Sequence, residues 1–392
     1  MDRTKIIGLL ILTFYLSVAV WLPFYNLHLK NIGFSGTQIG LVSGVYQASL
    51  FFIVPIWGLL SDRKGTYRVL RLALAMTLVL ILGMRYLHNF YIVLPYILLL
   101  AFFHHPLGTL LDSLAIQQIY TDGRSSYGAM RVWGSLGWAL GTTVMGQYLL
   151  RHSLDHIFPA ASIVFLAALL MMFALRNTPV PFGTGHDLSV RRVVSVFSEK
   201  RILLFLLILI LYGIAVAPLY VFINLYYYDI GANTQIVGIA FAVQSLSEIP
   251  FFFSGRWLAR RFGTSNLLLS VMGVAILRML VYSIVSDPVI AVIVGIAQGV
   301  TFSLFWVGVV EYMHGLIPSE WRSTGQSLLW AFHLGAGVTI GNVCIGRLSD
   351  LYAMQRVMLM AAGVTALVLG LTALYFKTQK SNIRINPEPG SV

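Results

Sequence analysis

Residues 24–33 read Phe-Tyr-Asn-Leu-His-Leu-Lys-Asn-Ile-Gly, and residues 222–231 read Phe-Ile-Asn-Leu-Tyr-Tyr-Tyr-Asp-Ile-Gly, so five of ten positions recur 198 residues further on. Other positions recur at an offset of 197: Thr37-Gln38-Ile39, Gln47, Gly58, Gly128 and Trp133 are repeated as Thr234-Gln235-Ile236, Gln244, Gly255, Gly325 and Trp330. Two copies of one unit therefore make up the chain. Internal repeats with a solute site between them are typical of secondary transporters.

The composition indicates a membrane protein. Of the 392 residues, 58% are hydrophobic and only 10% are charged, whereas a soluble domain carries roughly 25% charged residues. A spanning helix needs about 20 mostly apolar residues. We expect an all-α membrane protein whose transmembrane helices form two pseudo-symmetric six-helix bundles, with twelve helices near 6–28, 38–60, 69–88, 90–118, 130–150, 157–175, 201–228, 235–258, 265–285, 288–313, 323–346 and 355–376.

The net charge of +12 indicates topology rather than nucleic-acid binding. If the N-terminus is cytoplasmic, 20 of the 26 Lys and Arg residues fall on cytoplasmic segments, five on the outer side, and Arg278 within the membrane. Such a bias places both termini in the cytoplasm. The sequence thus predicts a multi-pass protein of the plasma (inner) membrane.

The Pro- and Gly-containing stretch before residue 200 predicts a linker between the bundles, and the polar end of the chain predicts a disordered tail. We expect four parts: an N-terminal bundle (1–176), a cytoplasmic linker (177–200), a C-terminal bundle (201–376) and a disordered cytoplasmic tail (377–392).

Residues 58–68 read Gly-Leu-Leu-Ser-Asp-Arg-Lys-Gly-Thr-Tyr-Arg, between the second and third expected helices. They resemble the signature loop of the major facilitator superfamily, and the residues that carry the resemblance are Gly58, Asp62, Arg63, Gly65 and Arg68. A degenerate copy follows at 255–263, where Ala259 replaces the acidic residue. The resemblance implies a gating loop in which Asp62 caps a helix end, a contact worth roughly 0.3–1 kcal/mol, and steadies the outward-open state.

The opening of the fifth helix, residues 127–140, resembles lactose permease and its relatives, the branch that also holds nucleoside and phenylpropionate permeases. The resemblance implies a substrate site in which Arg131 pairs with Asp112 of the fourth helix and Trp138 stacks on a sugar ring. A carboxylate and a guanidinium suit hydroxyl or carboxylate groups, and an aromatic face suits a ring. A purely structural pair bracing two helices is the competing interpretation.

Charged residues inside a membrane are expensive and mark functional sites. Glu248 and Arg278 resemble the carboxylate and the guanidinium that link solute binding to protonation in the same branch, and movement of one against the other would change proton affinity. The tenth helix lacks the branch's His and Glu, because residues 298–303 read Gln-Gly-Val-Thr-Phe-Ser. The proton carrier is therefore open among Glu248, Asp112 and Glu311, although Glu311 also fits a solvated interface.

Other polar residues on inner helices are candidates for the cavity wall, with interhelical hydrogen bonds as an equal alternative: Asn26, Gln47, Asn224, Gln244 and His105. Adjacent histidines point about 100° apart on a helix, so His104 and His105 do not predict a metal site. No phosphate-binding glycine motif for ATP is present, and no catalytic constellation suggests an enzyme. We expect no cofactor beyond the coupling proton, no nucleic-acid partner, and a monomer in the lipid bilayer.

These observations predict proton-coupled symport of a small hydroxylated solute, a sugar or nucleoside, by alternating access. Symport of an aromatic acid such as phenylpropionate is the main alternative. Efflux is disfavoured because the fifth helix lacks the proline of the efflux motif. A non-transporting sensor is disfavoured because it would be expected to lose the intramembrane charges.

Overall fold

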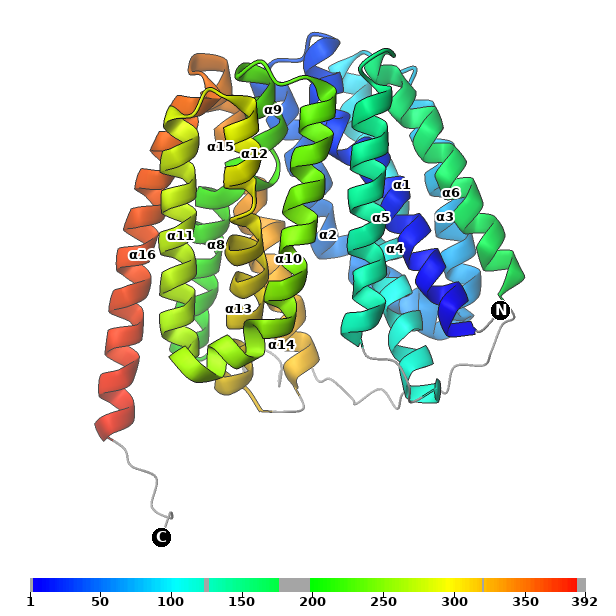
Figure 1. Ribbon diagram of the computed structural model, residues 1–392. Coiled ribbons are helices and arrows are strands. Elements are labelled where there is room, and N and C mark those ends of the chain that lie inside the picture. Colours follow the sequence, from blue (N-terminus) through cyan, green and yellow to red (C-terminus); the bar gives the residue numbers. More distant parts are fainter. Residues whose placement is uncertain (1–2, 123–126, 176–197, 319–320, 386–392) are drawn as a thin grey trace.

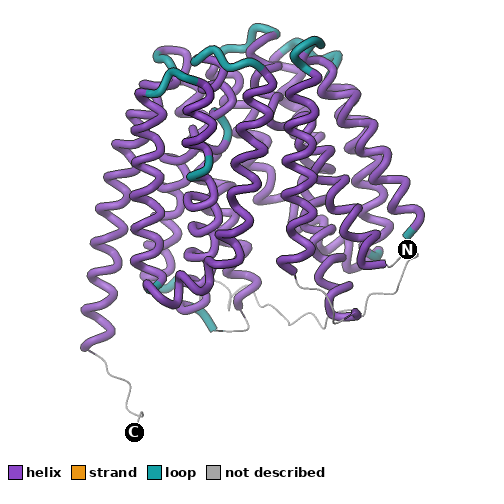
Figure 2. Tube along the Cα trace, viewed as in Figure 1, coloured by secondary structure: helices purple, strands orange, loops and turns teal. Residues whose placement is uncertain are grey.

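A computed structural model of the chain describes residues 3–122, 127–175, 198–318 and 321–385. Within these ranges the chain forms helices joined by short loops, without β-strands (Figures 1 and 2). Eleven described helices are long and apolar enough to cross a membrane. α5 (Tyr127–Tyr148) runs beside them as a further helix of the bundle. The expected all-α membrane architecture is confirmed.

The first half contributes six helices and the second half six helical passes, several of them interrupted. The N-terminal bundle holds α1 (Arg3–Asn31), α2 (Gly36–Lys64), α3 (Thr66–Met84), α4 (Phe90–Asp122), α5, the turn η1 (Leu154–His156) and α6 (Ile157–Ala174). The C-terminal bundle holds α8 (Lys200–Tyr220), α9 (Ile223–Asp229), α10 (Thr234–Phe262), α11 (Thr264–Ile284), α12 (Pro288–Gly295), the π-helical η2 (Gly299–Leu304), α13 (Phe305–Leu316), α14 (Arg322–Trp330), the π-helical η4 (Ala331–Val338), α15 (Thr339–Leu351) and α16 (Met354–Ile385).

The second half is less regular than the sequence predicts. The helix expected over 201–228 divides into α8 and α9, and those expected over 288–313 and 323–346 each contain a π-helical segment. π-Helical turns are frequent at functional sites, and Gly299 and Gly337 within them lie against the backbone of neighbouring helices. The prediction of a disordered tail was wrong for residues 377–385, because α16 continues to Ile385, just before the first proline of the tail.

The two bundles meet along two helix crossings, α2 with α15 and α5 with α10. We call the side where α1 begins and α16 ends the terminal face, and the opposite side the distal face (Figure 1). At the distal face, the Asp350 carboxylate accepts hydrogen bonds from the backbone amides of Gly36 (2.5 Å) and Thr37 (2.9 Å) of the other bundle. Among the described side chains near the terminal face, the ion pairs Arg256–Glu311 and Arg201–Glu199 lie within the second half of the chain.

Glycine allows these crossings to be tight. At the α5–α10 crossing, a Cβ atom added to Gly238 would overlap the carbonyl oxygen of Thr142 and lie 3.1 Å from the Cα of Gly146. Small residues permit this backbone approach between membrane helices. The glycine pattern thus supports the joint between bundles on the distal side.

We expect Gly238→Ala to lower the melting temperature of the purified protein in detergent, because overpacking costs about 1–3 kcal/mol. Gly273→Ala in α11 is the matched control, since its added Cβ would meet nothing within 4 Å; there the better helix propensity of alanine leaves stability unchanged or raised. Equal melting temperatures for the two variants would contradict a tight α5–α10 crossing.

The predicted gating loop is a single-residue connection between α2 and α3. Gly65 occupies a φ of +86°, its repeat equivalent Gly263 one of +80°, and such backbone conformations favour glycine. Arg63 and Arg68 are exposed, and a Cβ on Gly58 would meet nothing within 4 Å. The side chain of Asp62 lies outside the described residues, so its capping role stays a prediction.

Candidate functional site

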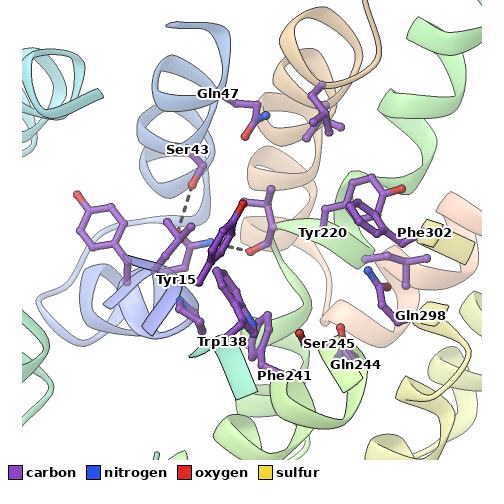
Figure 3. Close-up of a pocket in the computed structure, with 18 of the residues that line it drawn as sticks. Tyr15, Ser43, Gln47, Trp138, Tyr220, Phe241, Gln244, Ser245, Gln298 and Phe302 are labelled. Atoms are coloured by element: carbon purple, nitrogen blue, oxygen red, sulfur yellow. Dashed lines mark hydrogen bonds between the residues drawn. The ribbon is translucent and has the colours of Figure 1, made fainter. Parts of the chain in front are cut away.

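A cavity of about 370 Å³ lies between the two bundles (Figure 3). Its wall combines aromatic rings with amide and hydroxyl groups. The polar and aromatic residues that line it are Tyr15, Trp21, Tyr25, Asn26, Ser43, Tyr46, Gln47, Ser135 and Trp138 from the first bundle and Tyr220, Phe241, Gln244, Ser245, Glu248, Gln298 and Phe302 from the second. Both halves of the repeat therefore contribute to one site.

Glu248 is the only charged side chain among the described residues that line this cavity. It lies on α10, two residues before Pro250, and is half-buried. Its main-chain carbonyl accepts a hydrogen bond from Ser303 Oγ at 3.3 Å, and the amide of Gly299 donates to Ser247 Oγ at 3.1 Å. The wide turns of η2 are thus fastened to the part of α10 that carries the carboxylate.

Arg278 of α11 is buried beside the cavity rather than in its wall. Its Nη1 donates to Gln298 Oε1 at 2.5 Å and to Thr301 Oγ1 at 3.1 Å, and the guanidinium lies 5.4 Å from the centre of the Tyr282 ring. None of the ion pairs between described residues includes Arg278. The described hydrogen-bond partners of Arg278 are therefore neutral: Gln298 and Thr301 of the tenth pass, and Tyr282 of its own helix.

Asn26 and Asn224 form a reciprocal pair of hydrogen bonds between the bundles. Asn26 Nδ2 donates to the carbonyl of Val221 at 2.7 Å, and Asn224 Nδ2 donates to the carbonyl of Pro23 at 2.8 Å. Both donors and both acceptors are related by the offset of 198 residues. The break between α8 and α9 leaves the carbonyl of Val221 free to accept the bond from Asn26. In a continuous helix the amide of Leu225 would occupy this carbonyl, but here that amide bonds to Asn224 Oδ1 (2.8 Å).

The four other cavity candidates divide by position. Gln47 and Gln244 line the cavity, as Asn26 does, while Asn224 serves the contact between bundles. His105 is not a lining residue. Its Nε2 lies 2.7 Å from the main-chain carbonyl oxygen of Tyr46, which is a lining residue. His105 therefore contacts the backbone of a lining tyrosine rather than the cavity.

The residues predicted to hold the solute are only partly brought together. Trp138 lines the cavity, as Figure 3 shows. Asp112 lies on α4, half-buried and outside the set of lining residues. The backbone of Arg131 belongs to α5, but its side chain lies outside the described residues, so its pairing with Asp112 stays a prediction.

Glu311 lies apart from the central cavity. Its Oε1 is 3.0 Å from Arg256 Nε, and this Arg256 side chain is largely exposed. Glu311 lines a smaller hollow among the ends of α8, α11, α13 and α16. This placement matches the solvated alternative weighed for it from the sequence.

Several lining residues were missed by the sequence argument. Those with rings or hydrogen-bonding groups are Tyr15, Trp21, Tyr25, Ser43, Tyr46, Ser135, Tyr220, Phe241, Ser245, Gln298 and Phe302. Helical spacing could have found some of them, because positions 241, 244, 245 and 248 fall on one face of a helix. Gln298 and Phe302 are also four residues apart, but the π-helical turns of η2 change the register of the tenth pass, so α-helical spacing does not predict which of its residues face the cavity.

Comparison with known proteins agrees with this architecture. The MFS_1 like family matches residues 5–360. The maltose permease of Geobacillus stearothermophilus is 26% identical over 343 residues, covering 86% of this chain and 85% of that protein. The probable 3-phenylpropionic acid transporter of Escherichia coli K12 is 24% identical over 353 residues, covering 88% and 91%.

Among solved structures, a point mutant of the nucleoside transporter NupG superposes with a TM-score of 0.89 at 17% identity, covering 96% of this chain and all of that one. This likeness shows that the fold is shared. The family match extends over nearly the whole chain, from the first helix into the last. The chain therefore belongs to the MFS_1 like family of the major facilitator superfamily and is a multi-pass membrane transporter.

Proposed function

We propose that this transporter is a proton-coupled symporter of a small neutral hydroxylated solute, a sugar or a nucleoside, working as a monomer by alternating access. The observation that carries the proposal is the shared cavity, whose described wall combines seven amide or hydroxyl side chains outside its tyrosines, several aromatic rings and a single carboxylate, Glu248. Hydroxyl groups of a solute can bond to the amides and the carboxylate, while a ring can lie against the aromatic faces.

The positive-inside bias supports a cytoplasmic terminal face in the plasma membrane. With this orientation, the hydrogen bonds of Asn26, Asn224 and Asp350 lie on the outer side and at mid-depth, which supports an inward-open assignment for the described conformation. Alternating access would require Asn26, Asn224 and Asp350 to release their partners when the outer side opens.

An aromatic acid is the second candidate substrate. The aromatic wall and the phenylpropionic acid relative favour it. A carboxylate solute, however, would meet Glu248 in a described wall that offers no basic side chain, since Arg278 lies behind Gln298. Bringing two like charges together in a cavity of low dielectric is unfavourable, so the wall favours the neutral solute.

The test is uptake into proteoliposomes that contain a fluorescent pH indicator. Maltose, uridine or 3-phenylpropionate is added outside, and internal acidification is followed against liposomes without protein. We expect acidification with maltose or uridine. A response to 3-phenylpropionate alone, after subtraction of undissociated-acid leak, would move the substrate class to aromatic acids. No response to any of the three would contradict proton symport of these classes.

A further inference from the structure

The polar contact behind the cavity wall determines which way one amide of that wall faces. Arg278 is 2% exposed, and its nearest described partners are the neutral side chains of Gln298 and Thr301. A buried guanidinium needs acceptors for its N–H groups. Gln298 supplies one of them through Oε1 at 2.5 Å.

This contact fixes the orientation of the Gln298 amide chemically. A guanidinium has only donors, so the atom of Gln298 that faces Arg278 must be the carbonyl oxygen. The NH₂ group then points away from Arg278, and no described residue accepts a hydrogen bond from it. Because Gln298 also lines the cavity, this donor is available to a solute (Figure 3).

Gln244 provides an internal comparison. It lines the same cavity, and its Nε2 is buried without a described partner. No cation of a described side chain contacts its amide, so the amide can rotate to offer either an oxygen or an NH₂ group. Gln298 lacks this freedom as long as Arg278 holds its oxygen.

We propose that Gln298 is a specificity-determining residue: Arg278 acts as a positioning residue that presents the Gln298 NH₂ group as a fixed donor to a carbonyl, ring or hydroxyl oxygen of the solute. The proposal rests on the transport function proposed above. It adds the Gln298 NH₂ group as the donor that distinguishes one solute from another. It also gives Arg278 a role that needs no ion pair with Glu248. A site built to hydrogen-bond one solute group discriminates against solutes that leave it unpaired.

Gln298→Glu is the most direct test. The glutamate keeps an oxygen for Arg278 but replaces the donor by an acceptor, so the solute loses a hydrogen bond and meets a repelling oxygen. We expect KM for the transported solute to rise about tenfold or more. Thr301→Val is the matched control, because it removes the other acceptor of Nη1 from a residue outside the cavity wall; its KM should stay within about twofold.

A double-mutant cycle separates positioning from simple support of the fold. We expect Arg278→Met to raise KM several-fold in the wild-type background and to add less than about twofold in a Gln298→Met background. The assay is counterflow exchange of labelled maltose, uridine and 3-phenylpropionate in proteoliposomes, with the melting temperature recorded for each variant. Should Arg278→Met fail to fold, the comparison of Gln298→Glu with Thr301→Val decides alone.

The outcomes are distinct. An unchanged KM for Gln298→Glu, in a system where the wild type exchanges a solute, would overturn this proposal and leave the transport function standing. Equal effects of Arg278→Met in both backgrounds would show that Arg278 does not act through Gln298. A wild-type protein that exchanges none of the three solutes would overturn the proposed function, and this proposal with it.

Discussion

Replacing Glu248 by Gln should abolish uphill uptake and leave exchange of solute across the membrane intact. Glu248 is the only charged side chain in the described cavity wall, and a neutral amide of the same size cannot carry a proton through the transport cycle. Coupling to one proton supports about tenfold accumulation per unit of pH difference. The variant should therefore level off at equal concentrations inside and outside, while wild-type protein accumulates solute.

The measurement is paired. Accumulation in proteoliposomes under an imposed pH gradient is compared with counterflow exchange in the same preparation. Glu311→Gln is the matched control, because Glu311 pairs with exposed Arg256 away from the central cavity; its accumulation should match the wild type. Persistent uphill uptake by Glu248→Gln would exclude Glu248 as the proton carrier and favour Asp112 as the carrier instead.

Much of the fold follows from the sequence because membranes restrict the choice of structure. Lipid cannot satisfy free backbone groups, so long apolar segments must be helices, and the repeat from residue 24 to residue 222 implies two similar bundles. The sequence did not predict the local breaks within individual helices. The division of the seventh pass at Val221 and Phe222 depends on the side chain of Asn224 taking over one backbone hydrogen bond, which composition does not reveal.

The site was predictable where repeat and chemistry agreed. Gln47 and Gln244 are repeat-related, polar and on inner helices, and both line the cavity. His105 does not line the cavity, because its ring nitrogen contacts the main-chain carbonyl of Tyr46, a contact that residue type alone does not predict. The sequence marks Arg278 as a charge within the membrane, but it does not reveal the neutral partners Gln298 and Thr301, because their place against Arg278 depends on the fold of the tenth pass.

The second large effect is expected at the reciprocal asparagine pair. Asn26→Ala combined with Asn224→Ala removes both hydrogen bonds that join the bundles near Pro23 and Val221. Such bonds in membranes average about 0.6 kcal/mol and reach about 1.7, so the pair is worth about 1–3 kcal/mol. We expect the outward-open population to rise by roughly 5- to 150-fold, since 1.4 kcal/mol corresponds to a factor of ten.

Accessibility to a membrane-impermeant maleimide measures this shift. Cys344 is the only cysteine of the chain, so Cys344→Ala provides a background for Leu22→Cys, a reporter in the cavity wall. Labelling of intact cells from outside should become faster in the double alanine variant. Asn233→Ala is the matched control, because Asn233 accepts a hydrogen bond from Ile236 within one bundle; a double variant that labels no faster than this control would contradict a gating role.

The pseudo-symmetry of the two bonds also predicts how the two single asparagine variants should behave. The two bonds have different donors and acceptors and nearly equal lengths, 2.7 and 2.8 Å. If each is an independent part of the closed outer side, each single substitution should supply about half of the free energy, and its effect on labelling should be near the square root of the double effect. A single variant that reproduces the whole effect would mean that the bonds break together, because losing either one lets the two bundles separate as rigid bodies.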